Sequence, residues 1–221
     1  MAAGGATAQY SYTWTGASPG THTITAKATY SGGSSESSPV TVIVPWKIMP
    51  IGNSITQANT SHDSYRRPLW HMLSDSGYPV DFVGSLTTNY GGANPNPDFD
   101  RDHEGHWGWH IDDVLDGCHH HPTVCYSGTL GEWLAADTPD IALVHLGTND
   151  CYHESEATCV DSSVMETERL IDTLLNYNSS MKILLAQLIP MNNSRNYLIE
   201  QFNDSIPVIA ERRSGSQVVV V

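Results

Sequence analysis

The sequence predicts an α/β fold in which helices cover both faces of a five-stranded parallel sheet, after a short all-β segment. Three observations support this. Short apolar runs recur between residues 47 and 221, and segments with helical periodicity separate them. Residues 10–44 instead hold β-branched runs separated by Gly, Ser and Pro. Strands that alternate with helices form a parallel sheet inside a three-layer α/β/α arrangement.

The elements of this sheet follow from apolar runs and from start and stop signals. Ser64 is predicted to cap the first helix, Gly77 to end it, and Pro207 to interrupt the last helix. Strands are expected at 47–52, 79–85, 140–147, 182–191 and 217–221, and helices at 64–77, 131–137, 161–177 and 196–215.

The N-terminal residues form a separate segment. Three short strands are expected at 10–16, 21–30 and 39–44. They resemble the C-terminal half of a bacterial immunoglobulin-like domain. A complete sandwich of that kind needs about 100 residues. The predicted domains are therefore a partial immunoglobulin-like segment, 1–44, and an α/β domain, 45–221.

The charge of the chain restricts its partners. Its net charge is −14 over 221 residues, with only 10 Lys and Arg. This argues against nucleic acid and against anionic membrane surfaces. No apolar run is long enough to cross a bilayer. An uncharged polymer suits such a surface better.

The four cysteines lie in two close pairs in polar loop sequence. Cys118 with Cys125, and Cys151 with Cys159, fit two local disulfides in a secreted protein. Zinc is the alternative, because His119, His120 and His121 follow Cys118. Neither cysteine spacing is typical of a structural zinc site.

Three polar segments lie where predicted strands end, at the edge of a parallel sheet where ligands bind. Ser54, in Gly52-Asn53-Ser54, follows the first strand, where backbone amides can face an anion. This position suits a nucleophile, although a helix N-cap is the simpler interpretation.

The other two segments are 102–109 and 145–150. Gly105 and Gly108 stand among aromatic residues, which indicates close backbone approach or a packed loop. Asn149 ends the third strand, where its amide could face a developing negative charge or simply form a turn.

Together and in this order, the segments resemble the SGNH (GDSL-type) hydrolases, and among them carbohydrate esterase family 3, the acetyl xylan esterase type. The matching text covers roughly residues 46–221, and DHEGHWGW narrows the resemblance beyond the superfamily. The resemblance implies a flavodoxin-like strand order. The matching stretches are IMPIGNSIT, SYRRPLW, VDFVGS, DFDRDHEGHWGWHID, PDIALVHLGTND and LLAQLIP.

The resemblance assigns a role to each segment. Ser54 matches the nucleophile, and its backbone amide belongs to the oxyanion hole. Gly108 matches the second oxyanion donor through its backbone amide, and Asn149 the third through its side chain. Acyl transfer through a Ser54 acyl-enzyme is the implied reaction.

The sequence departs from the family pattern in three ways. Asn53 stands where the family usually has Asp, and Trp107 where it often has a small residue. The family carries its base histidine and orienting aspartate on a loop after the fifth strand. This sequence stops at Val221, and no histidine follows His153. The triad Asp and His are therefore expected to be absent, together with the last helix. The substitute bases considered are His103, His106 and His110.

The expected function is removal of acetyl groups from xylan or a related polysaccharide by a secreted serine esterase. The partner is an acetylated plant polysaccharide, and the chain is expected to act as a monomer within a longer multidomain protein. Trp107 and Trp109 are expected to line the substrate site, and neither a metal nor another cofactor is expected. The alternatives are a lipolytic or thioesterase-type SGNH hydrolase and a non-catalytic carbohydrate-binding remnant.

Overall fold

The computed structural model describes residues 9–120, 123–125, 128–214 and 217–221. The chain divides into two compact units, Met1–Pro45 and Trp46–Val221. No helix within the described ranges is both long and apolar enough to span a bilayer.

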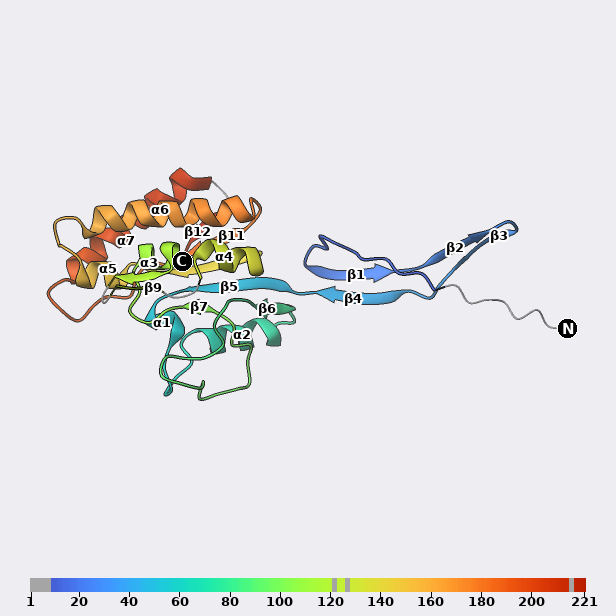
Figure 1. Cartoon of the computed structure of the whole chain (residues 1–221), viewed down its shortest axis with the longest axis horizontal. Helices are drawn as coiled ribbons and strands as arrows, with labels where there is room; N and C mark the ends of the chain where they lie inside the picture. Colours follow the sequence, from blue (N-terminus) through green and yellow to red (C-terminus); the bar gives the residue numbers. More distant parts are fainter. Residues whose placement is uncertain (1–8, 121–122, 126–127, 215–216) are drawn as a thin grey trace. The chain divides into compact units, whose positions relative to one another are not determined.

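The first unit consists of two antiparallel ribbons (Figure 1). One pairs β1 (Gly20–Ile24) with β4 (Val40–Val44), and the other pairs β2 (Lys27–Tyr30) with β3 (Gly33–Glu36). The strand predicted at 10–16 is wrong, because these residues have no regular structure. A half-sandwich of immunoglobulin type is not confirmed.

The second unit is built on a parallel sheet with the order β12-β11-β10-β5-β6. In chain order this is 5-4-3-1-2, so the flavodoxin-like order is confirmed. The two-residue strand β7 also pairs with β5. The strands are β5 (Trp46–Gly52), β6 (Val80–Phe82), β7 (Glu104–Gly105), β10 (Ile141–His145), β11 (Lys182–Leu185) and β12 (Val218–Val220).

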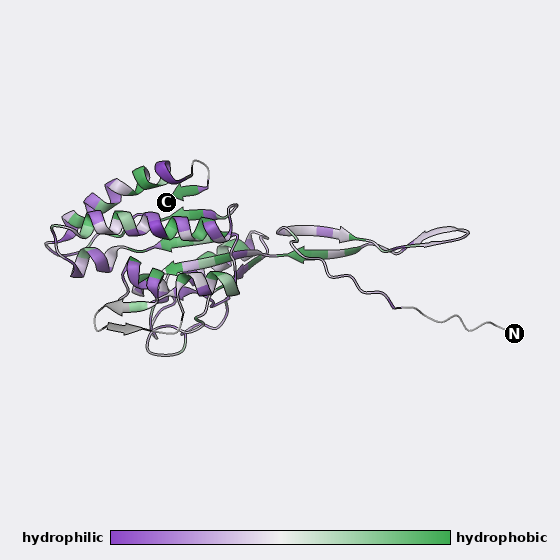
Figure 2. Cartoon of the chain, turned by 45° about the horizontal axis from the view of Figure 1, so that its top comes forward, coloured by the Kyte–Doolittle hydropathy of each residue, from purple (hydrophilic) through white to green (hydrophobic). Residues whose placement is uncertain are grey.

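Helices lie on both faces of this sheet (Figure 1). One face carries α6 and α7 with α3 and α4, and the other carries α1 and α2. The central strands are mostly hydrophobic, while the helices mix hydrophobic and hydrophilic residues (Figure 2). The helices are α1 (Ser54–Gln57), α2 (Arg66–Asp75), α3 (Ile111–Asp116), α4 (Leu130–Ala136), α5 (Thr148–His153), α6 (Cys159–Tyr177) and α7 (Asn196–Ser214).

Helix α7 passes through Pro207 without a break, so the predicted interruption is wrong. Proline has no N–H group for the carbonyl four residues earlier, which belongs to Asn203. Gln187 Nε2 donates a hydrogen bond to that carbonyl at 3.1 Å. The Asn203 side chain also bonds both backbone groups of Leu188. Because of the proline, the Asn203 carbonyl is free to accept a hydrogen bond from Gln187, which attaches the loop after β11 to α7.

The start of α2 differs from the prediction, whereas its end agrees. Tyr65, not Ser64, is the N-cap residue, and Ser64 has a φ angle of 54°. The Ser64 hydroxyl donates to the Thr56 carbonyl at 3.0 Å. Gly77 follows the helix with a φ angle of 80°, which suits a glycine after a helix end.

The predicted bridge between Cys151 and Cys159 is wrong, because both are free, buried thiols. Burial, together with the neighbouring Cys159, raises the pKa of the Cys151 thiol to about 12. Disulfide formation needs a thiolate, which this environment disfavours.

The other cysteine pair lies in a hairpin of β8 (Cys118–His120) and β9 (Thr123–Cys125). Cys118 is directly opposite Cys125 in its register. The side chain of Cys125 is outside the described residues, so this bridge stays a prediction. The zinc alternative falls on His119, His120 and His121, whose side chains are also outside them.

Arg66, the first residue of α2, is completely buried. Its guanidinium donates to the backbone carbonyls of Thr56, Gln57 and Arg101 at 2.8–3.0 Å. It also donates to Asn89 Oδ1 at 2.7 Å. Burial lowers its pKa to about 10, so the group stays charged at neutral pH. One side chain therefore joins the end of α1 to two loop segments beside the sheet.

We expect Arg66→Lys to lower the free energy of unfolding by about 3 kcal/mol or more, because an ammonium group cannot reach all four acceptors. For a domain of this size, the melting temperature should fall by about 10 °C. Thermal unfolding followed by circular dichroism would measure the change.

Arg67→Lys is the matched control, since the adjacent Arg67 is exposed and pairs with Asp98. Its effect should be much smaller. Equal melting temperatures for the two variants would contradict the role given to Arg66.

Candidate active site

Ser54 is the first residue of α1, directly after β5. The N-cap is Asn53, whose Oδ1 accepts the N–H of Ile55 at 3.0 Å. Ser54 is therefore not the capping residue, and its hydroxyl is not used for that purpose. Asn53 is completely buried. Gly52 is required here, because a Cβ atom would lie 2.0 Å from Thr56 Oγ1.

The loop that contains Gly108 is attached to the Ser54 segment at several points. Strand β7 pairs with the end of β5. The backbone N–H of His106 donates to the Gly52 carbonyl at 2.9 Å, and that of Trp107 to Gln57 Oε1 at 2.7 Å. Gly108 has a φ angle of 82°, which favours glycine.

Asn149 follows β10, the neighbour of β5 in the sheet. Its Nδ2 donates to the carbonyl of Trp109 at 2.7 Å, which places the amide beside the Gly108 loop. An amide nitrogen carries two hydrogens, so one donor is left for a substrate. The structure thus joins all three segments predicted from the sequence.

Asp150 holds the same junction, a role that was not predicted from the sequence. It is completely buried, and its Oδ1 accepts the N–H of Ile111 at the start of α3, at 3.1 Å. Burial raises the pKa of this carboxyl well above its usual value. In the sequence, the acidic residue directly after Asn149 is the signal that hints at this role.

A hollow of about 400 Å³ opens in front of Ser54. Apolar side chains of Ile55, Trp107 and Ile189 form much of its wall. Ser64 and Tyr65 also line it, and so does His62, which the sequence analysis did not single out.

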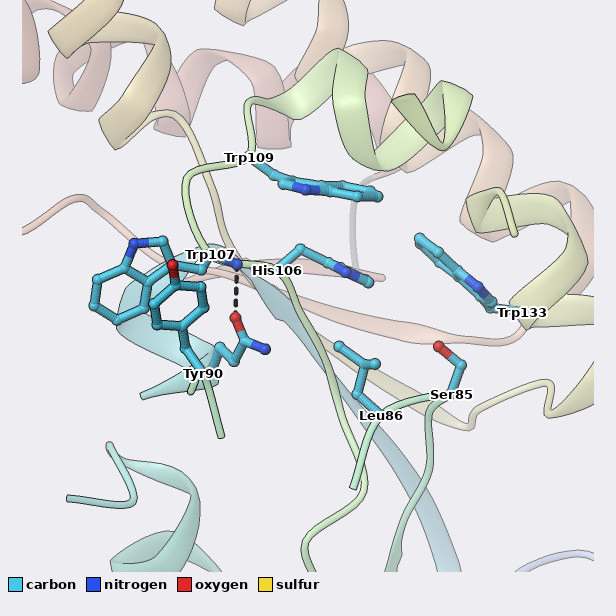
Figure 3. Close-up of a pocket in the computed structure, with 8 residues that line it drawn as sticks. Ser85, Leu86, Tyr90, His106, Trp107, Trp109 and Trp133 are labelled. Atoms are coloured by element: carbon cyan, nitrogen blue, oxygen red, sulfur yellow. Dashed lines mark hydrogen bonds between the residues drawn. The ribbon is translucent and has the colours of Figure 1, made fainter. Parts of the chain in front are cut away.

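The substitute bases considered from the sequence are engaged elsewhere. His103 is buried, and its Nδ1 accepts the Gly105 N–H at 2.9 Å. The His106 ring stacks on those of Trp109 and Trp133, and its Nε2 lies 3.0 Å from a Glu104 oxygen (Figure 3). His110 is buried at the start of α3.

Two further histidines complete the comparison. His145 is buried in an apolar hollow lined by Leu69, Leu143 and Leu184, so it packs against the sheet. His62 shares the hollow of Ser54, and its Nδ1 accepts the Ser64 N–H at 3.3 Å. That bond places the proton on Nε2, which cannot then take a proton from serine. None of these five histidines is arranged as a base for Ser54.

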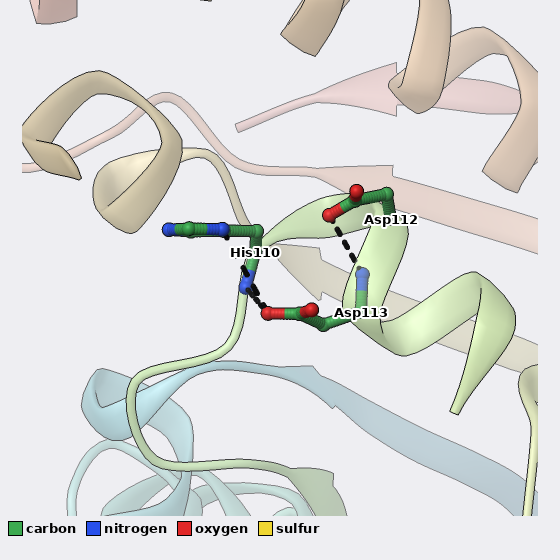
Figure 4. A group of neighbouring side chains, drawn as sticks. All are labelled: His110, Asp112 and Asp113. Atoms are coloured by element: carbon green, nitrogen blue, oxygen red, sulfur yellow. Dashed lines mark hydrogen bonds and ion pairs between the residues drawn. The ribbon is translucent and has the colours of Figure 1, made fainter. Parts of the chain in front are cut away.

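One cluster could hold a metal ion among the described residues. Ligand atoms of His110, Asp112 and Asp113 lie within 4.8 Å of one another (Figure 4). Both carboxylates already accept backbone N–H groups at 2.8 Å, Asp113 from His110 and Asp112 from Asp113. These bonds are those of a helix start, so the cluster has a structural role without an ion.

Burial of His103 predicts a pH-dependent stability. Burial lowers the pKa of its imidazole to about 3, while the unfolded chain titrates near 6.5. Below pH 6.5 the unfolded state takes up a proton that the folded state does not. Between pH 7 and pH 4.5 this should cost about 2–3 kcal/mol of stability.

His103→Asn should be less stable than the parent at pH 7 but should lose less stability on acidification. Urea unfolding at several pH values would measure both. Parallel pH profiles for parent and variant would contradict this account of His103.

Comparisons with known proteins agree with this geometry. No protein-family model matches the chain. A multidomain esterase from Ruminococcus flavefaciens is 30% identical over 190 residues, which cover 78% of this chain. The chain spans about a quarter (23%) of that relative's length.

Solved structures are also similar. A serine-to-alanine mutant of an acetyl esterase, with an acetate ion, has a TM-score of 0.63 and 26% identity, covering 79% of this chain and 78% of that one. A carbohydrate esterase of family 3 from Talaromyces cellulolyticus has a TM-score of 0.63 and 27% identity, covering 80% and 77%. One from Clostridium thermocellum has a TM-score of 0.61 and 27% identity, covering 80% and 78%. The unit Trp46–Val221 thus has the fold of the SGNH (GDSL-type) esterases and resembles, among them, carbohydrate esterase family 3.

Proposed function

We propose that the unit Trp46–Val221 is a secreted serine esterase that removes acetyl groups from xylan or a related plant polysaccharide, acting as a monomer. The observation that carries the proposal is the junction of Ser54, the Gly108 loop and Asn149 at one edge of the sheet. An acetyl esterase among the similar solved structures supports the acyl group chosen.

In the proposed reaction, Ser54 Oγ attacks the carbonyl carbon of the acetyl ester. The backbone amides of Ser54 and Gly108 and the Asn149 side chain donate to the oxyanion. The ester C–O bond then breaks, the sugar oxygen leaves with a proton, and an acetyl-enzyme remains. Water attacks this acetyl group and releases acetate. The resemblance assigns the proton transfer to a histidine after the fifth strand.

The choice of a short acyl group rests on the acetyl esterase among the similar structures. Ile55, Trp107 and Ile189 place bulky apolar side chains on the wall of the Ser54 hollow. A lipolytic or thioesterase function would need space for a long chain next to Ser54. Activity that rises from acetyl to octanoyl esters would favour that alternative.

None of the five histidines considered above is arranged as a base for Ser54, so the test supplies one in solution. We expect 2-methylimidazole, a base that is hindered as a nucleophile, to increase acetate release from acetylated xylan by this chain. Ser54→Ala should remove the increase completely. Equal rates for the parent and Ser54→Ala at every 2-methylimidazole concentration would contradict the proposal and favour a non-catalytic carbohydrate-binding role.

Asn149→Ala should reduce the same rate about 100- to 1000-fold, the usual effect of losing one oxyanion donor. The His103→Asn variant, assayed at pH 7, is a control for loss of loop packing without loss of a donor. A drop in the His103 variant as large as that in Asn149→Ala would mean that disturbed packing, and not a missing donor, lowers the rate.

A further inference from the structure

A second hollow, of about 330 Å³, lies beside the Ser54 hollow. Trp107 lines both, so one indole forms the wall between them. The remaining lining residues of the second hollow are Gln57, Ser85, Leu86, Tyr90, His106, Trp109 and Trp133 (Figure 3).

Trp107 and Tyr90 form an exposed aromatic stack at this wall. Their ring centroids are 4.4 Å apart, and the planes differ by 20°. The side chains are 39% and 52% exposed. By contrast, Trp109 is only 4% exposed and stacks on His106 at 4.2 Å. Trp109 is therefore part of the floor, and Trp107 with Tyr90 is the aromatic surface that a ligand can reach.

The polar groups around this stack suit an uncharged, hydroxyl-rich ligand. The Gln57 side-chain oxygen accepts the Trp107 N–H, and its Nε2 has no hydrogen bond among the described residues. No Asp, Glu, Lys or Arg belongs to the described lining of the hollow. Aromatic faces pack against the C–H surfaces of a pyranose ring, while side-chain amides bond its hydroxyls.

The stack is also held in place before any ligand arrives. The Trp107 backbone is fixed by Gln57, and its neighbour His106 by the Gly52 carbonyl. A fixed aromatic platform loses little conformational entropy on binding. The position of Trp107 between the two hollows places such a platform next to the nucleophile.

We propose that Trp107 and Tyr90 form a subsite for a neutral sugar ring of the polymer, adjacent to the ring whose acetyl group enters the Ser54 hollow. This inference rests on the proposed polysaccharide substrate. It assigns sugar binding to Trp107 and Tyr90. Trp109 has a structural role in the floor of the hollow.

The test measures binding without hydrolysis. Ser54→Ala is titrated with xylotetraose, which carries no acetyl group, and the dissociation constant is obtained by calorimetry. Adding Trp107→Ala should weaken binding about tenfold, and adding Tyr90→Ala should weaken it less. Trp107→Phe should retain most of the affinity, because an aromatic face remains.

Tyr152→Ala is the matched control, since Tyr152 is 51% exposed and lies on α5, outside the described lining of both hollows. Its affinity should equal that of the parent. Unchanged affinity in Trp107→Ala, equal losses in Tyr152→Ala and Trp107→Ala, or no binding by Ser54→Ala would each overturn the subsite. Sugar binding that depends on Trp107, without Ser54-dependent acetate release, would sink the esterase proposal alone.

Discussion

The buried guanidinium of Arg66 is the interaction on which the surroundings of Ser54 depend. Its partners are carbonyl and amide oxygens from three segments, not carboxylates. Burying a charge this way is costly unless every donor is satisfied. The cost is offset because the group replaces the water that these turn carbonyls would otherwise need. The loops can therefore pack closely, without solvent between them.

The effect of Arg66 reaches the Gly108 loop through one residue, Gln57. The Gln57 carbonyl accepts from Arg66, and its side-chain oxygen accepts from the Trp107 N–H. Asp150 attaches the other end of this loop, because its carboxylate accepts the backbone N–H of Ile111 at the start of α3. Catalytic groups held by such a framework lose little freedom when charge develops on a substrate. The same framework positions Trp107, which lines both the Ser54 hollow and the second hollow.

Much of the fold could be predicted from the sequence, because apolar runs and helical periodicity report directly on burial. The helix break predicted at Pro207 is wrong, because the tertiary structure brings Gln187 to the Asn203 carbonyl that the proline leaves without a backbone partner. The three site segments could be found because parallel strands bring their carboxyl ends together. The positions of Tyr90 and His62 beside the hollows could not be predicted, because long irregular loops bring them there. A disulfide between Cys151 and Cys159 was predicted wrongly, because the spacing of cysteines in a sequence does not show that they are buried as free thiols.

The central claim is that the Gly108 amide and the Asn149 side chain face an oxyanion formed on Ser54. The most direct measurement is a ¹⁵N NMR titration of the chain with methaneboronic acid, which forms a tetrahedral anionic adduct on a serine hydroxyl. The account predicts large shifts of the Gly108 N–H and Asn149 Nδ2 resonances, and none in Ser54→Ala. Resonances that do not move, or that move equally in Ser54→Ala, would contradict it.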